Sequence, residues 1–163
     1  MCTFISPTYG NVNFEQIIQI MRSFYNKHSA FGHCNVIIGT DSQNFSDTKM
    51  VSAIVMQCEG KGGIYFYCVE MVPRIADVRQ KLNYETQRSL EYADKLLEVM
   101  LDKDEDLFSS ISFSIHIDAG HSDRGKTKEL IPSLVGWIHA CGYECQVKPD
   151  SFAASTIANR ISK

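Results

Sequence analysis

Two aspartates stand where apolar runs end, a position that suits them to bind a cation rather than to fill a core. Asp41 closes the apolar run at residues 36–41, and Asp118 closes the run at residues 111–118. A buried strand that stops on an acid beside Gly or Ser places its carboxylate at the edge of a sheet. Carboxylate oxygens are ligands that Mg²⁺ prefers. The pattern therefore predicts a divalent-cation site at a sheet edge.

The bulk composition is that of an ordinary globular protein. The chain has 163 residues, of which 44% are hydrophobic and 21% charged, which suits one domain over residues 1–163, with a lead-in and a helix in residues 1–32. The net charge of −3 gives no general attraction to nucleic acid. Binding of nucleic acid would therefore need a local basic patch or metal ions.

Cysteine usage and the lack of membrane-like segments predict a cytoplasmic protein. The six cysteines form no CxxC pair, and most lie in apolar runs, so we expect reduced thiols. No basic stretch with a long apolar core opens the chain, and no apolar run is long enough to span a membrane. The cysteines are Cys2, Cys34, Cys58, Cys68, Cys141 and Cys145.

Hydrophobic periodicity and turn residues predict the elements that would position the acids. Glycine-rich residues 59–63 favour a hairpin turn, and residues 102–106 favour an acidic turn. The expected elements are an irregular lead-in at residues 6–10, helices at 13–27, 75–101, 126–140 and 151–161, and strands at 35–41, 50–58, 64–72, 111–118 and 144–148.

This order predicts an α/β fold with a five-stranded mixed sheet and an extra N-terminal helix. The first three strands form an antiparallel meander, and the last two run parallel to the first because helices connect them. If the first and fourth strands are neighbours, their backbones lie about 4.8 Å apart. Asp41 and Asp118 would then lie close enough to share a metal ion.

Four phrases of the sequence carry a resemblance to a known group. They are Ile38-Gly39-Thr40-Asp41-Ser42-Gln43, His116-Ile117-Asp118-Ala119-Gly120, residues 125–131 and Lys148-Pro149-Asp150-Ser151. With the element order, they make the chain similar to the RNase H-like superfamily and, more narrowly, to its YkuK-like group. The likeness spans nearly the whole chain.

The resemblance implies a nuclease that cleaves phosphodiesters with two Mg²⁺ or Mn²⁺ ions. It implies Asp41 as the bridging ligand, Asp118 and Glu85 on one ion, and Asp150 on the other. Only the resemblance selects Glu85, because a helical Glu is usually solvated and Glu70, Asp77 and Glu91 are rivals. Asp41 and Asp118 could instead cap turns, and Asp150 a helix.

Residues 120–127 also fit the phosphate-cradling pattern GxxxxGK[ST]. Only 36 residues follow Thr127, too few for the further parallel strands of a nucleotide hydrolase. The loop could instead hold a substrate phosphate at a helix N-terminus. The residues expected to contact substrate are Ser42, Gln43, Arg124, Lys126, Thr127 and Lys148.

Several functions therefore stay open at this level. The foremost is a metal-dependent nuclease acting on RNA, RNA–DNA hybrid or structured DNA. The alternatives are a non-catalytic nucleic-acid-binding module and a nucleotide-binding protein. His116, Asp118 and His121 also allow a zinc site, although buried or surface histidines are the favoured explanation, because the third ligand would lie in an unconstrained loop. Aromatic residues 65–67 could stack on bases or pack.

Overall fold

The computed structural model describes residues 2–120, 125–148 and 150–151 of the chain. The predicted helix at residues 151–161 lies almost wholly outside the described residues. The described elements are β1 Phe4–Ser6, β2 Gly10–Val12, α1 Phe14–His28, a 3₁₀ turn Ser29–Phe31, β3 Cys34–Asn44, β4 Thr48–Cys58, β5 Gly63–Val72, α2 Val78–Lys103, α3 Glu105–Ser110, β6 Ser112–Gly120, α4 Lys126–Ala140 and β7 Glu144–Lys148.

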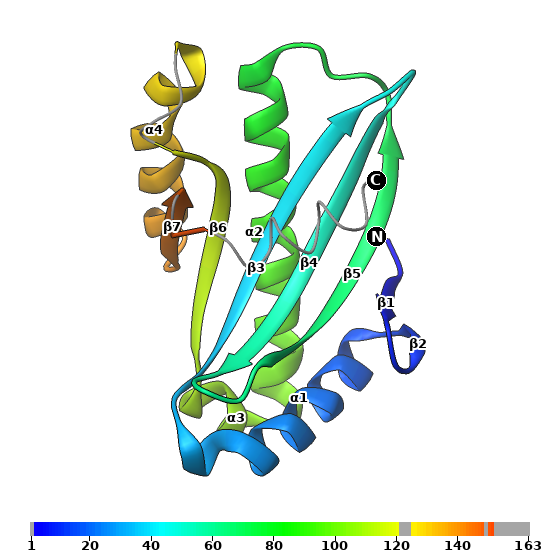
Figure 1. The fold of residues 1–163 in the computed structure, drawn as a ribbon, viewed down its shortest axis with the longest axis vertical. Helices are drawn as coiled ribbons and strands as arrows, with labels where there is room; N and C mark the ends of the chain where they lie inside the picture. The colour runs from blue at the N-terminus through cyan, green and yellow to red at the C-terminus, as the bar shows by residue number, and fades with distance from the viewer. Residues whose placement is uncertain (1, 121–124, 149, 152–163) are drawn as a thin grey trace.

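All described strands belong to one mixed sheet in the order β2-β1-β5-β4-β3-β6-β7 (Figure 1). The meander β3-β4-β5 is antiparallel, and β6 and β7 are parallel to β3, as the sequence predicts. The predicted count of five strands is wrong, because the described sheet has seven. The two extra strands are β1 and β2, at the edge beyond β5.

The predicted irregular lead-in is in fact largely a short hairpin. β1 pairs with β2 in antiparallel fashion, and Ile5 of β1 pairs with Tyr67 of β5. The Ser6 hydroxyl accepts the backbone N–H groups of the next turn, from Thr8 at 3.2 Å and Tyr9 at 3.1 Å. Strands of three residues are too short for alternation to reveal them, so pairing with β5 and not local pattern defines them.

Helices α1, α2 and α4 pack against the same side of the sheet and bury its main core. The Asn13 side chain caps α1 in a capping box with Gln16, and α1 ends within one residue of its predicted end. The buried face of α2 includes Leu82, Leu90, Ala93, Leu96 and Met100. None of the helices in the described part of the chain is both long and apolar enough to cross a bilayer.

The opposite sheet face carries a smaller apolar cluster of Ile37, Ala53 and Val55, with Tyr65 beside it. Side chains alternate along a strand, so these residues face away from Ile38 and Ile54 of the main core. The sheet is therefore apolar on both faces at its centre. Tyr65 packs here as a core-flanking residue, one of the two roles that the sequence left open.

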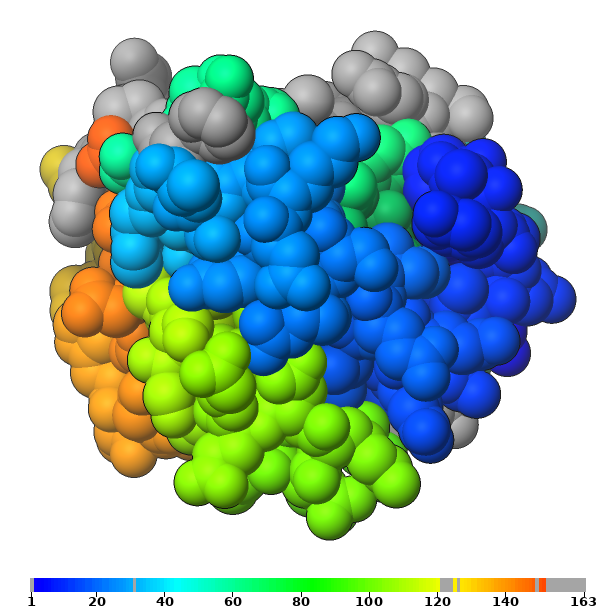
Figure 2. All heavy atoms as spheres, turned by 90° about the horizontal axis from the view of Figure 1, so that it is seen from below, coloured from blue at the N-terminus to red at the C-terminus, as the bar shows by residue number. Residues whose placement is uncertain are grey.

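The acidic stretch predicted to be a turn at residues 102–106 contributes to a further helix, α3. Asp104 accepts the N–H of Leu107 at 3.1 Å and so caps α3, while Leu107 is buried. Arg22 of α1 binds Asp104 at 2.6 Å and Asp106 at 3.0 Å. These ion pairs hold α1 and α3 side by side (Figure 2), at the end of the molecule opposite the carboxyl end of β3 (Figure 1).

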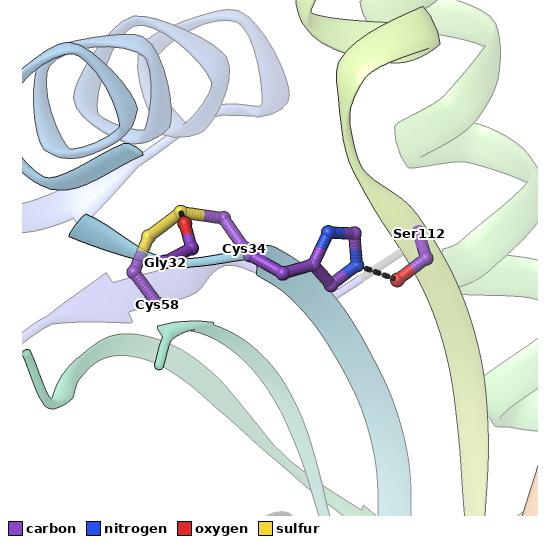
Figure 3. Close-up of a disulfide and its surroundings, with 5 residues drawn as sticks. Gly32, Cys34, Cys58 and Ser112 are labelled. Atoms are coloured by element: carbon purple, nitrogen blue, oxygen red, sulfur yellow. Dashed lines mark hydrogen bonds between the residues drawn. A yellow bond between two sulfur atoms is a disulfide. The ribbon is translucent and has the colours of Figure 1, made fainter. Parts of the chain in front are cut away.

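The prediction of reduced cysteines is wrong for one pair. Cys34 and Cys58 form a disulfide between the start of β3 and the end of β4, where they are direct cross-strand partners (Figure 3). The pattern could not reveal it, because 24 residues separate the two cysteines and only the meander brings them together. Cys2, Cys68, Cys141 and Cys145 are free thiols.

We expect reduction of the Cys34–Cys58 disulfide to lower the free energy of unfolding by about 2–4 kcal/mol, since the cross-link restricts the unfolded chain. Urea unfolding with and without a thiol reductant measures this change. A Cys34→Ser/Cys58→Ser variant should not respond to the reductant, whereas Cys141→Ser, at an exposed free thiol, should respond like the wild type. Alkylation of Cys34 and Cys58 in unreduced, denatured protein would contradict the expectation.

Candidate functional site

Asp41 and Asp118 lie at the same edge of the sheet, on the neighbouring strands β3 and β6. The parallel register pairs Asn35 with Ser112 and ends with Gly39 opposite His116. Asp41 and Asp118 each follow this last pair by two residues. Beyond Gly39, β3 stays paired with β4 up to Asn44. The two acids therefore flank the place where β3 and β6 cease to pair.

The pairing of β6 with β7 is irregular around Asp118. Between His116 and Gly120 the strand advances four residues while β7 advances two, from Gln146 to Lys148. Such bulges bend a strand and redirect side chains, and they are frequent beside active sites. A Cβ atom at Gly120 would lie 2.8 Å from the Lys148 carbonyl oxygen, so glycine permits this close approach. The Lys148 ammonium lies 3.3 Å from Asp118 Oδ1.

Glu85 enters the same region from α2. The Ser42 hydroxyl donates a hydrogen bond of 3.0 Å to Glu85 Oε2, and the Ser42 N–H donates one of 2.9 Å to Asp41 Oδ1. One turn further along α2, Ser89 donates to the Thr40 hydroxyl at 2.9 Å. Ser42 thus links two of the acids, and the buried hydroxyl pair fixes α2 against β3.

These side chains line a hollow of about 340 Å³, here called the acid pocket. Three carboxylates predicted from the sequence share it, together with two of the predicted substrate contacts. The lining residues are Asp41, Ser42, Val78, Lys81, Leu82, Glu85, Asp118 and Thr127.

The sequence analysis did not identify Lys81. It lies one helical turn before Glu85, and its charge lowers the pKa values of Asp41 and Glu85, although burial raises both pKa values more strongly. The four-residue spacing from Lys81 to Glu85 was a signal that could have revealed it.

Asp41 and Glu85 hold their protons unusually tightly. Burial, and after it the Asp118 charge, raises the pKa of Asp41 from 3.8 to about 6. Burial, and after it the Asp41 charge, raises the pKa of Glu85 from 4.5 to about 8. Only 7% of Glu85 is exposed, so its charged form loses most of its hydration. Ionising this pocket without a counter-charge is therefore unfavourable.

The three rivals of Glu85 have other partners. Glu70 and Glu91 each bind Arg88, at 2.8 Å and 2.9 Å, and Asp77 accepts the N–H of Gln80 as the cap of α2. None of the three lines the acid pocket, whereas Glu85 does. The structure therefore brings together the three acids on β3, α2 and β6 that the resemblance selects.

Four further residues were predicted from the sequence to belong to the site: Asp150, Gln43, Lys126 and Arg124. Asp150 follows β7, is exposed, and donates its N–H to the Val147 carbonyl at 2.9 Å. It is absent from the pocket lining, as is the exposed Gln43. Lys126 begins α4, and Arg124 lies outside the described residues.

The zinc and nucleotide alternatives depend in part on residues 121–124, which also lie outside the described residues. His116, the histidine of the zinc alternative that is described, is only 7% exposed, and burial lowers its pKa to about 4, so it is neutral at neutral pH. Part of the phosphate-loop pattern lies within the described residues. Gly125 precedes α4 with a φ of 63°, and Thr127 lines the acid pocket.

The donor atoms of the pocket suit a hard divalent cation, since three carboxylates and a hydroxyl supply only oxygen ligands. Within residues 2–120, 125–148 and 150–151, however, no three His, Cys, Asp or Glu side chains form a ready-made metal cluster. The Ser42 hydroxyl instead binds Glu85, and the Lys148 ammonium binds Asp118. The chemistry fits Mg²⁺ or Mn²⁺, and binding would require these contacts to rearrange.

The sequence comparisons assign the chain to a family. The family model for Ribonuclease H-like proteins matches residues 14–163, so the chain belongs to the Ribonuclease H-like family. Within it, the chain is 31% identical over 169 residues to "Uncharacterized protein YkuK" of Bacillus subtilis (strain 168), covering 98% of this chain and 96% of that protein. The resemblance stated from the sequence is thereby confirmed.

Solved structures match less closely. Catalytic domains of the Mos1 transposase, one with raltegravir and manganese and one of the Mos1 mariner transposase alone, match at 15% and 14% identity. Both have a TM-score of 0.31 and cover 87% of this chain. This chain spans about 60% of the length of those chains. At this score the matches carry no argument about function.

Without divalent ions, we expect the free energy of unfolding to fall as the pH rises from about 4.5 to about 8. The raised pKa means that folded protein keeps the Glu85 proton up to about pH 8, whereas the unfolded chain releases it near 4.5. The stability that the protonated Glu85 contributes below about pH 4.5 is therefore lost as the pH rises to about 8. Glu85→Gln cannot ionise, so it should exceed the wild type in stability at pH 8 by at least about 1 kcal/mol.

Urea unfolding in the presence of a chelator, across this pH range, measures the effect. Glu98→Gln is the matched control, because Glu98 is exposed on the same helix, and it should follow the wild-type pH profile. A Glu85→Gln variant with an unchanged pH dependence would show that Glu85 is not the group responsible. Asp41 contributes a similar loss of stability at lower pH, between 3.8 and about 6.

Proposed function

We propose that this protein is a divalent-metal-dependent phosphodiesterase acting on nucleic acid, with Asp41, Glu85, Asp118 and Asp150 as its metal ligands. The observation that carries the proposal is the acid pocket, in which carboxylates from β3, α2 and β6 line one hollow. Membership of the Ribonuclease H-like family supports it. The pKa of Asp41 is raised to about 6 and that of Glu85 to about 8, so the pocket favours a bound cation that offsets their charges.

Mg²⁺ or Mn²⁺ bound by these carboxylates would supply an activated water and neutralise charge on the phosphate. The Asp118 charge raises the pKa of Asp41, and the Asp41 charge raises the pKa of Glu85 more than the Asp118 charge does. This favours Asp41 as the shared ligand. Ser42 orients Asp41 and Glu85 through its two hydrogen bonds.

The cationic groups around the pocket are suited to hold the phosphate. Lys81 lines the pocket, and Lys148 lies beside Asp118. Thr127 lines it from the first turn of α4, a helix of 15 residues whose N-terminus carries a partial positive charge. These groups offset the net charge of −3 locally, so that an anionic strand can approach.

Asp150 completes the proposed ligand set from the end of β7. Asp150 is exposed and follows Lys148 by two residues, which supports its inclusion in the ligand set. Lys148 pairs with Gly120, two residues after Asp118. The Asp150 carboxylate would join the site from the solvent side.

One observation favours a second candidate, a nucleic-acid-binding module without turnover. The Lys148 ammonium already partners Asp118, so a cation of the protein occupies part of the place that a metal would take. If this pairing persists with substrate bound, the site would bind phosphate without cleaving it. Salt-dependent binding of nucleic acid without metal-dependent cleavage would identify this candidate.

We expect cleavage of RNA, RNA–DNA hybrid or branched DNA in the presence of Mg²⁺ or Mn²⁺, followed on gels with end-labelled substrates. Asp41→Asn should lower the rate by about a hundredfold or more, because the amide removes the charge that holds the cation. Asp118→Asn should behave similarly. Asp47→Asn is the matched control, since Asp47 is exposed in the β3–β4 turn, and it should keep full activity.

The result that would overturn the nuclease is the absence of cleavage of every substrate with either metal, or equal cleavage by Asp41→Asn. Binding of Mn²⁺ should also raise the melting temperature of the wild type, and raise that of Asp41→Asn less. The change in melting temperature tests the metal site even when none of the nucleic acids tried is a substrate.

A further inference from the structure

A second hollow lies on the other side of the first turns of α2 from the acid pocket. It has a volume of about 570 Å³, within the range of small-molecule sites, and is here called the side pocket. Its lining includes Arg74, Gln80, Asn83, Tyr84 and Gln87. None of these residues lines the acid pocket.

The two pockets share one helix wall. The acid pocket uses α2 residues from Val78 to Glu85, and the side pocket uses residues from Gln80 to Gln87. They therefore lie at the same height along α2, and a helix with its side chains is about 10 Å wide. A nucleic-acid strand that crosses the N-terminal turn of α2 could therefore place a phosphate in the acid pocket and a base a few nucleotides away in the side pocket.

Tyr84 forms a fixed aromatic wall of the side pocket. The Arg88 guanidinium donates to the Tyr84 hydroxyl at 2.7 Å and lies 5.1 Å from the ring centroid. Tyr84 also donates to Glu70 at 3.4 Å, and Glu70 in turn pairs with Arg88. A ring held by such a network loses little freedom when a base stacks on it, which favours binding.

The polar groups of the side pocket match the edges of a nucleobase. Gln80, Asn83 and Gln87 each present a side-chain amide, which offers both donors and an acceptor. Gln87 is oriented by a hydrogen bond of 3.1 Å to Glu91. Arg74, exposed at the pocket, adds a positive charge suited to the phosphate of the same nucleotide.

We infer that the side pocket is a base-binding subsite, which takes one unstacked nucleobase of the strand whose phosphate lies in the acid pocket. This inference rests on the proposed function for the orientation of the strand. A base within a duplex is stacked and paired, so it cannot enter a pocket beside α2. The substrate class is therefore single-stranded or locally unpaired nucleic acid.

An abasic scan tests the subsite. Fluorescence anisotropy would measure binding of a labelled single-stranded oligonucleotide, as RNA and as DNA, to the Asp41→Asn protein with Mg²⁺ present. A series of strands, each with one abasic nucleotide, should contain one position at which binding weakens by about tenfold. The duplex of the same sequence should bind more weakly than the single strand.

The Asn83→Ala/Gln87→Ala variant, made in the same background, completes the test. It should bind the intact strand about tenfold less tightly and lose its sensitivity to the abasic position, because the base no longer has its contacts. Gln19→Ala is the matched control, since it removes an exposed amide from α1. It should retain both the affinity and the abasic sensitivity.

The outcomes separate this inference from the proposed function. Equal binding of all abasic strands would overturn the base-binding role of the side pocket, even if the wild type cleaves nucleic acid. A Gln19→Ala effect as large as that of the double variant would overturn it as well. Abasic sensitivity that requires Asn83 and Gln87 supports the side pocket even if no metal supports cleavage. Failure to bind any strand overturns the inference.

Discussion

The parallel pairing of β3 with β6 is the constraint on which the candidate site depends. It brings Asp41 and Asp118 to the same edge of the sheet, and it stops two residues before each of them. The strands then follow different partners, β3 staying with β4 and β6 approaching β7 after an irregular segment. The opening between the strands is where carboxylates from both can face one hollow.

The fold keeps the carboxylates of the acid pocket close together although their charges repel one another. Glu85 is buried beside Asp41, and both its burial and the Asp41 charge raise the cost of ionising it. Ser42 and Lys81 reduce this cost by hydrogen bonding and charge, and the hydroxyls of Thr40 and Ser89 keep α2 close to β3. The scaffold thus keeps the acids together, although their mutual repulsion would separate them in a looser fold. A bound cation would relieve the repulsion that the scaffold maintains.

Helix α2 gives the two pockets different chemistry through its periodicity. Residues Lys81 and Glu85, four apart, point one charged stripe toward the sheet edge. Asn83 and Gln87, also four apart, point a neutral amide stripe toward β5 and the residues after it. A single rigid element therefore separates a site suited to phosphate chemistry from one suited to a base. Because both belong to the same helix, their spacing is fixed by helical geometry.

The sequence by itself determined the long elements and the two strand-end acids, because their signals are local. Apolar runs and helical periodicity place β3 to β7, α1, α2 and α4 close to their predicted bounds, and Asp41 and Asp118 end two of those runs. The YkuK-like resemblance added Glu85, which no local pattern separates from other helical acids.

Only the tertiary structure decided the rest, because those features depend on residues distant in the chain. The short strands β1 and β2 need β5, the Cys34–Cys58 disulfide needs the meander, and Lys81 acquires its role when α2 meets β3 and β6. The raised pKa values of Asp41 and Glu85 likewise arise from burial and mutual proximity, which no local sequence window contains.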